Sequence, residues 1–253
     1  MMRLPRRLAH GEEAAVVDHL EELRSRLVVA GGAVLLGTIV GYLVHRPALH
    51  LLIQALPPGH RRLLTLGVTE PFTTSLKLSI VIGIALALPI VLWQIWAFLA
   101  PAFNRGRGNG IAVLTATAAG LMLVGVAFGY HVALPAALHF LTNYDSSVYD
   151  TQIRASDYLS FATLVLAACG AVFELPVVVI GLVRVGALTS AKLRRNRRIG
   201  YFTVAVIGVA LPGVDPVTTV LETIPLALLF EASIWISVLC ERRWQSTLAP
   251  LAR

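Results

Sequence analysis

The stretch Lys77–Leu99, KLSIVIGIALALPIVLWQIWAFL, decides the fold class. After Lys77 it carries no charged side chain, and it exceeds the roughly 20 apolar residues that a helix needs to cross a bilayer. The whole chain agrees, because 57% of its 253 residues are hydrophobic and only 14% are charged. Soluble domains average about 45–50% apolar and about 25% charged residues. The sequence therefore predicts an all-α, polytopic membrane protein.

Six apolar segments are candidates for membrane spans. They are Leu27–Val44, Lys77–Leu99, Ile111–Leu134 (or on to Leu141), Tyr158–Val183, Ile199–Leu211 and Val217–Cys240. Only 16 residues separate Arg198 from Asp215, which is about 24 Å of helix against a hydrocarbon core of about 30 Å. We therefore expect six transmembrane helices, of which the last two are short. One re-entrant hairpin in place of these two is the alternative.

The distribution of basic residues predicts the orientation. With the amino terminus inside, 16 of the 21 Lys and Arg residues fall on the cytoplasmic side, and Arg46, Arg61, Arg62, Lys77 and Arg154 fall on the other. The positive-inside bias then places both termini in the cytoplasm. It also explains the net charge of +7 without nucleic acid, because no basic patch is interleaved with aromatic residues.

Three regions follow from this pattern. Residues 1–26 are expected to be a cytoplasmic segment, residues 27–240 one six-helix membrane domain, and residues 241–253 a cytoplasmic tail. Val16, Leu20, Leu23 and Leu27 recur at helical spacing, so Ala14–Leu27 is predicted to be an amphipathic helix. The piece Ala48–Leu56 is too short to cross the membrane and is predicted to lie at its surface.

Acidic side chains in apolar segments are the candidates for chemistry. Glu174 lies in the middle of a span, where a carboxylate costs about 2–3 kcal/mol or more unless water or a partner satisfies it. It marks either a functional site or a polar clamp between helices. Glu222 and Glu231 could be structural or functional, and Asp215 could cap the last helix.

At the cytoplasmic side, the plain interpretation of Glu22 is a salt bridge to Arg26, four residues further on. The functional alternative is an acid that meets a basic peptide. Gln94 and Phe98 close the second span, where Phe98 could be an ordinary interfacial anchor. No catalytic motif, metal-ligand cluster or cofactor motif is present, so we expect no catalytic residue, no metal and no cofactor. An ion-coupled transporter remains an alternative because of the membrane acids and the short helix pair.

Several strings resemble one family. His19–Leu27, HLEELRSRL, is similar to the amino-terminal motif of TatC, the multispanning receptor subunit of the twin-arginine protein translocase. Similar strings follow in the same order over about residues 14–245: Glu70-Pro71-Phe72, Gln94–Pro101, Phe128-Gly129-Tyr130, Tyr158–Phe161, Phe173–Pro176, and Pro212 with Asp215.

The resemblance implies a cup-like bundle in a bacterial inner membrane. It implies a protein that binds twin-arginine signal peptides and, with TatA-like and TatB-like single-span partners, exports folded proteins using the proton-motive force. A homo-oligomer within a complex, in contact with lipid, is also implied. Glu22 would be an arginine-binding carboxylate, supported by Arg24, and Phe98 would pack against the peptide. Glu174 would face the wet interior, and Pro71, Phe72, Gln94 and Asp215 would make partner or structural contacts.

One position departs from the family pattern. The first cytoplasmic loop of the family usually carries a second arginine-binding glutamate, and the aligned residue here is Arg107. No acid occurs between Glu70 and Asp145 to replace it. Either Glu21 or a partner supplies the second carboxylate, or the chain is a divergent TatC-like scaffold with weakened signal recognition.

Overall fold

The computed structural model describes residues 10–99, 109–148, 152–184, 186–210 and 216–248. Within these ranges the chain is a helical bundle, and no β-strand forms beyond a single bridge between Leu64 and Arg154. The elements are α1 (His10–Ala55), η1 (Pro58–His60), α2 (Glu70–Leu99), α3 (Asn109–Phe128), η3 (Gly129–Ala133), α4 (Leu134–Asn143), α5 (Ala155–Phe173), α6 (Leu175–Arg184), α7 (Ser190–Arg195), α8 (Arg197–Ala210) and α9 (Pro216–Leu248). The predicted all-α fold is confirmed.

Five helical stretches are long and apolar enough to cross a membrane. They are His19–Ala55, Glu70–Phe98, Ala112–Asn143, Ala155–Arg184 and Pro216–Glu241. The remaining expected span corresponds to α8, which has only 14 residues and so rises about 21 Å. The chain is therefore a multi-pass membrane protein with five long spans and one short helix between them.

The last helix is longer than expected. The sequence predicted that both final helices would be short, but α9 has 33 residues. Its helix continues past Cys240 through Glu241-Arg242-Arg243, because charged residues with straight side chains favour a helix in water as well as in the membrane. The prediction of a short helix is therefore confirmed for α8 and wrong for α9.

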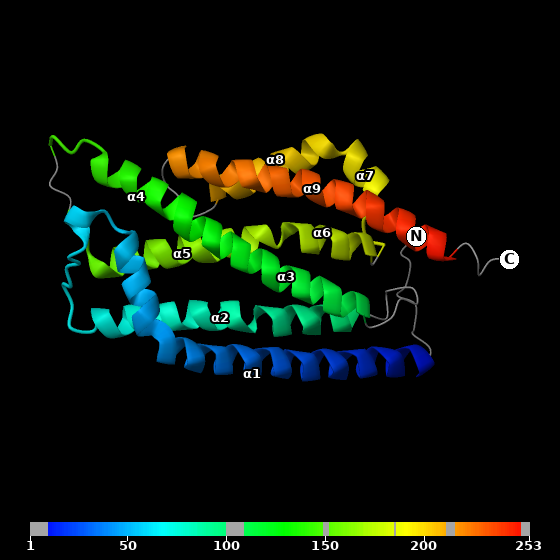
Figure 1. Ribbon diagram of the computed structural model, residues 1–253. Helices are drawn as coiled ribbons and strands as arrows, with labels where there is room; N and C mark the ends of the chain where they lie inside the picture. The colour runs from blue at the N-terminus through cyan, green and yellow to red at the C-terminus, as the bar shows by residue number, and fades with distance from the viewer. Residues whose placement is uncertain (1–9, 100–108, 149–151, 185, 211–215, 249–253) are drawn as a thin grey trace, which may run out of the picture.

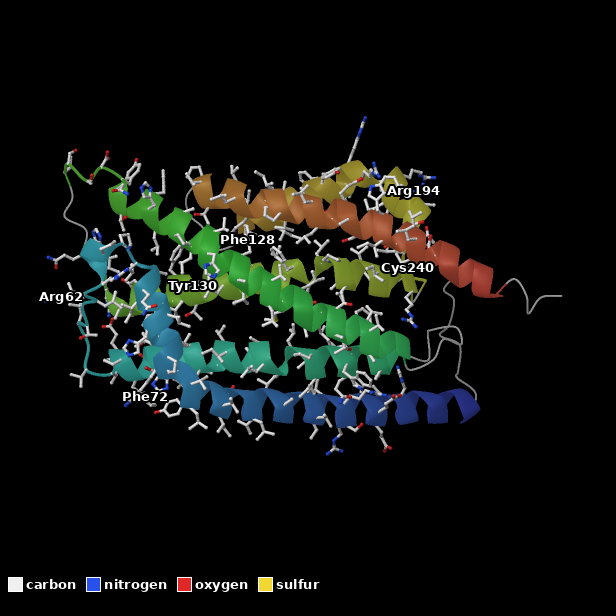
Figure 2. All side chains as sticks on the ribbon, viewed as in Figure 1. Arg62, Phe72, Phe128, Tyr130, Arg194 and Cys240 are labelled. Carbon is white, nitrogen blue, oxygen red and sulfur yellow. The ribbon has the colours of Figure 1, made fainter. Side chains whose placement is uncertain are left out.

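The helices run back and forth between two ends of the bundle (Figure 1). The first turns of α1 and the last turns of α9 lie at the same end of the bundle as α7. Figure 2 places Arg194 and Cys240 at this end, and Arg62 and Phe72 at the opposite one. We call these the α7 end and the loop end.

Two spans are interrupted at prolines. Before Pro135 the helix widens into the π-helical turn η3, which accommodates a residue that has no N–H to donate. The helix then continues to Asn143, which agrees with the longer of the two predicted spans, the one that ends at Leu141. Before Pro176 the helix breaks at Glu174, which separates α5 from α6.

The first helix also differs from expectation. α1 is continuous from His10 to Ala55 and contains Pro47, and it bends in its later part (Figure 1). The segment after Pro47, predicted to lie at the membrane surface, packs one face on the bundle, where Leu52 and Leu56 are 3% and 1% exposed, while Leu51 is 53% exposed. The hydroxyls of Tyr130 and Tyr158 donate to the carbonyls of Leu51 and Leu52. These contacts make the segment part of the core.

Small residues allow the closest helix approach. A Cβ atom on Gly83 of α2 would stand 2.4 Å from the backbone nitrogen of Thr38, and one on Gly37 of α1 would stand 2.5 Å from the carbonyl oxygen of Gly83. Since membrane helices associate through close packing rather than through the hydrophobic effect, these glycines fix α1 against α2. The pairing holds the amino-terminal turns of α1 beside the last turns of α2.

Candidate functional site

Three polar residues of α1 share one helical face at the α7 end. His19, Glu22 and Arg26 are spaced three and four residues apart, which places them one above the other on a helix. Glu22 and Arg26 are partly buried, and His19 is exposed. This face is turned toward the end of α2, because Arg26 and His19 both contact α2 side chains.

The Arg26 guanidinium binds side chains of both helices. Its Nε and one terminal nitrogen donate to Oε1 of Glu22 at 3.0 and 2.6 Å. Its other terminal nitrogen donates to Oε1 of Gln94 at 3.3 Å. The plain interpretation of Glu22, an ion pair with Arg26, is therefore confirmed. The pair also shows that the Glu22 carboxylate can accept two hydrogen bonds from one guanidinium.

An aromatic contact completes the group. The rings of His19 and Phe98 stack with their centroids 4.3 Å apart and an interplanar angle of 12°. His19 Nδ1 lies 3.5 Å from Oε2 of Glu22. We call His19, Glu22, Arg26, Gln94 and Phe98 the α1–α2 cluster. Sequence reasoning named Glu22, Gln94 and Phe98 as site residues, but it gave His19 no role and treated Arg26 only as a salt-bridge partner.

Two other predicted residues lie outside this cluster. Glu21 and Arg24 are exposed, and the 100° step per residue turns Glu21 away from Glu22 and puts Arg24 on the opposite side of α1. The structure therefore does not bring Glu21 to Glu22 as a second carboxylate. Arg107 and Asp215 lie outside the described residues.

Glu174 occupies the break between α5 and α6 and is separate from the α1–α2 cluster. It is 7% exposed, and neither carboxylate oxygen has a hydrogen-bond partner among the described residues. The structure thus shows, within the described ranges, no protein partner that would satisfy this acid, and its predicted contact with a wet interior stays a prediction. Glu222, on α9, is also buried, at 3% exposed.

Glu231 belongs to a bonded group on α8 and α9. Its carboxylate lies 2.9 Å from Arg197 and accepts hydrogen bonds from the Tyr201 hydroxyl at 2.9 Å and the Trp235 indole at 3.0 Å. Three donors satisfy this acid. The contacts therefore explain structurally why an acid stands in this apolar helix. Glu231 no longer supports the alternative of an ion-coupled transporter.

The loop end has a polar centre that sequence reasoning missed. The carboxylate of Glu70 accepts hydrogen bonds from the backbone N–H groups of Leu66, Gly67 and Ser156, at 2.9, 3.2 and 3.0 Å. Arg154 donates to the same carboxylate at 3.1 and 3.3 Å. These bonds to Glu70 raise the pKa of Arg154. We call this group the Glu70 clip, because it ties the loop before α2 to the start of α5.

Pro71 and Phe72 follow directly in the chain. Both are exposed at the loop end, and the Phe72 side chain is 60% exposed. Eighty-four positions separate Glu70 from Arg154, so no local pattern could pair them. The signal that the sequence does contain is a lone acid directly before a proline at a helix start.

The chain is similar to known proteins over most of its length. The family model for "Sec-independent protein translocase protein (TatC)" matches residues 18–225. A TatC of Carboxydothermus hydrogenoformans is 34% identical over 221 residues, which cover 87% of this chain and 91% of that protein. TatCd of Bacillus subtilis is 32% identical, with 89% and 92% covered. A crystal structure of the twin arginine translocase receptor TatC has a TM-score of 0.77 at 30% identity and covers 87% of this chain and 99% of that one.

Proposed function

This chain belongs to the TatC family of Sec-independent protein translocase proteins, and we propose that it is the receptor subunit that binds twin-arginine signal peptides. The proposed role is the export of folded proteins across the membrane, driven by the proton-motive force. The family is one of transport proteins, so the function assigned is transport rather than catalysis.

The observation that carries the proposal is the position of Glu22. Its side chain is 35% exposed at the α7 end, and it already holds a guanidinium through two nitrogen atoms. Arginine binds carboxylates through a planar fork that lysine lacks. A site of this kind therefore separates an arginine pair from a lysine pair of equal charge.

The neighbours of Glu22 suit an extended peptide. Phe98 and His19 offer a flat aromatic surface beside the carboxylate. Leu20 and Leu23, which are 58% and 40% exposed, add apolar area on the same helix. A signal peptide carries apolar residues next to its charged region. Its binding site therefore needs both a carboxylate and an apolar surface.

The placement in the membrane is part of the proposal. The α7 end carries Arg184, Lys192, Arg194, Arg195, Arg197 and Arg198, and the positive-inside bias favours this end for the cytoplasm. We propose a bacterial inner membrane with both termini cytoplasmic and with residues 27–240 as the membrane domain. Single-span TatA-like and TatB-like proteins are the proposed partners, and several copies of the chain would join one complex.

Site-specific photocrosslinking tests the receptor role. A photoreactive residue at Leu20 is exposed on α1, two positions before Glu22, and replaces no member of the α1–α2 cluster. We expect crosslinks to a twin-arginine peptide and at least tenfold fewer to the twin-lysine peptide, since hydrogen bonds to charged groups contribute about 1.5–3 kcal/mol. Equal crosslinks to both peptides would remove the basis of the proposal.

Arg107 supports the second candidate, a TatC-like scaffold with weakened signal recognition. It stands where the family pattern has an arginine-binding acid, and like charges repel an incoming arginine pair. On this alternative, Arg107→Glu strengthens crosslinking from Leu20 to the twin-arginine peptide. An unchanged yield in Arg107→Glu, together with arginine selectivity in the parent chain, favours the receptor.

A further inference from the structure

A groove opens between α6, α7, α8 and α9, away from the α1–α2 cluster. Its volume is ≈ 380 Å³. Its walls are almost entirely apolar, and they are formed mainly by Leu175, Val179, Leu193, Val204, Ile207 and Phe230. α8 is too short to match the hydrocarbon core of an ordinary bilayer, so lipid beside this helix must adapt to it.

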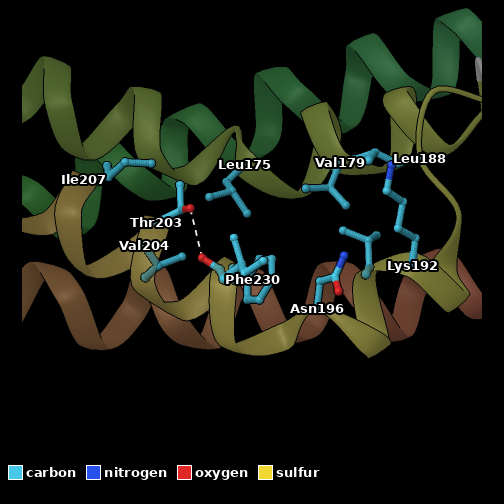
Figure 3. Close-up of a pocket in the computed structure, with 12 residues that line it drawn as sticks. Leu175, Val179, Leu188, Lys192, Asn196, Thr203, Val204, Ile207 and Phe230 are labelled. Atoms are coloured by element: carbon cyan, nitrogen blue, oxygen red, sulfur yellow. Dashed lines mark hydrogen bonds between the residues drawn. The ribbon is translucent and has the colours of Figure 1, made fainter.

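The groove has a cationic residue and an amide at one of its ends. Lys192 and Asn196 lie together at the same end, and Ile207 lies at the other (Figure 3). Lys192 supplies three N–H donors and a positive charge, and the Asn196 amide supplies two more donors. The groove therefore combines a small cationic, donor-rich end with a long apolar body.

The basic side chains at this end of the groove outnumber the acids, and most of those that the structure describes are not held in ion pairs. Among the residues that the structure describes, Lys192, Arg194, Arg195 and Arg198 form no ion pair. Neither described acid of this region is paired with Lys192. Glu231 is held by Arg197, and Glu241 accepts from the backbone N–H and the hydroxyl of Ser190.

We infer that this groove binds an anionic phospholipid of the membrane leaflet at the α7 end. The phosphate lies against the Lys192 ammonium and the Asn196 amide, and one acyl chain follows the apolar wall toward Ile207. Basic pockets between membrane helices on the cytoplasmic side bind anionic headgroups in this way. A protein helix in the same groove would fill the apolar body but leave the cationic end without a partner.

The experiment uses the full chain in lipid vesicles. Two photoactivatable lipids, phosphatidylglycerol and phosphatidylcholine with the reactive group in the acyl chain, are compared, and labelled peptides are mapped by mass spectrometry. We expect labelling of α6 and α8 next to Val179 and Ile207 to be about fivefold stronger with phosphatidylglycerol, the ratio that about 1 kcal/mol for one basic residue at an anionic surface gives. Lys192→Ala should remove this preference.

The control is Lys77→Ala, because Lys77 is the other lysine of the chain and lies on α2, away from the groove. It should leave labelling of α6 and α8 unchanged. Thr203→Trp is a second variant that fills the groove and keeps every charge, since Thr203 is an exposed lining residue. It should lower labelling by both lipids.

Three outcomes would overturn the inference. They are equal labelling of the groove by the two lipids, a lipid preference that survives Lys192→Ala, and a copurifying single-span protein that occupies the groove in place of lipid. None of these results depends on signal-peptide binding, so this inference and the proposed function can fail independently.

Discussion

The guanidinium of Arg26 lies 2.6 Å from Oε1 of Glu22, and the same guanidinium contacts Gln94 on the neighbouring helix. An arginine of the chain itself thus occupies the carboxylate that the proposed function assigns to an arginine of the signal peptide. An i,i+4 ion pair contributes only about 0.3–0.5 kcal/mol, so an incoming guanidinium can share or replace Arg26 at little cost. The pair keeps Glu22 charged and oriented, as the proposed function requires of a free receptor.

Phe98 should contribute packing rather than charge. Phe98→Ala removes the ring that stacks on His19, and an aromatic pair is worth about 0.5–1.5 kcal/mol, or about a threefold to tenfold loss of peptide affinity. Phe72→Ala is the matched control, because it removes a ring that is exposed at the opposite end of the bundle. Titration of a labelled signal peptide against both variants measures the difference. An equal effect of the two variants would contradict a specific role for Phe98.

Glu174 is expected to lower the stability of the folded protein. Its carboxylate is buried and has no hydrogen-bond partner among the described residues, and an acid inside a membrane helix costs about 2.5–3.5 kcal/mol. Glu174→Leu is expected to raise the melting temperature by several degrees, since 1 kcal/mol shifts it by about 2–4 °C in a chain of this size. Export of a twin-arginine substrate is expected to fall in the same variant. A lower melting temperature would show that Glu174 stabilises the fold.

The Glu70 clip should stabilise the loop end. Arg154→Ala leaves the buried carboxylate of Glu70 with backbone donors alone, so we expect a lower melting temperature and faster proteolysis of the loop before α2. Arg62→Ala is the control, because it removes an exposed arginine of that same loop. Similar melting temperatures for the two variants would mean that the clip contributes little.

The α1–α2 contact should not tolerate a methyl group. Gly83→Ala would place a Cβ atom 2.4 Å from the Thr38 backbone nitrogen, and such overpacking costs about 1–3 kcal/mol. Gly120→Ala is the control, because nothing lies within 4 Å of a Cβ atom there and alanine favours a helix by up to about 1 kcal/mol over glycine. Thermal unfolding in detergent should separate the two. Equal stability would argue against close packing of α1 on α2.

The sequence predicted the spans because their signal is local. Apolar runs such as Lys77–Leu99 need no knowledge of the rest of the chain, and the short α8 follows from the distance between two charges. The sequence does not predict contacts that tertiary packing decides. Leu52 and Leu56, in the segment after Pro47, pack on α4 and α5 residues such as Leu134 and Tyr158, and no pattern within α1 shows this.

For the candidate site, the sequence predicted individual residues but not the contacts between them. Glu22 and Phe98 came from a family resemblance, and their closeness is a result of the α1–α2 pairing. Helical geometry alone could have separated Glu22 from Glu21 and Arg24, because adjacent residues point 100° apart. Glu70 and Arg154 could not be paired, because 84 positions that include α2, α3 and α4 separate them and leave no local signal.

The most direct test of the central claim is the affinity of a twin-arginine peptide for Glu22→Gln compared with Glu21→Gln. Both variants lose one negative charge from neighbouring positions, but only Glu22 faces α2. We predict at least a tenfold loss for Glu22→Gln, as hydrogen bonds to charged groups contribute about 1.5–3 kcal/mol, and less than a twofold loss for Glu21→Gln, as expected for an exposed charge. Equal losses in the two variants, or no loss in Glu22→Gln, would contradict the account.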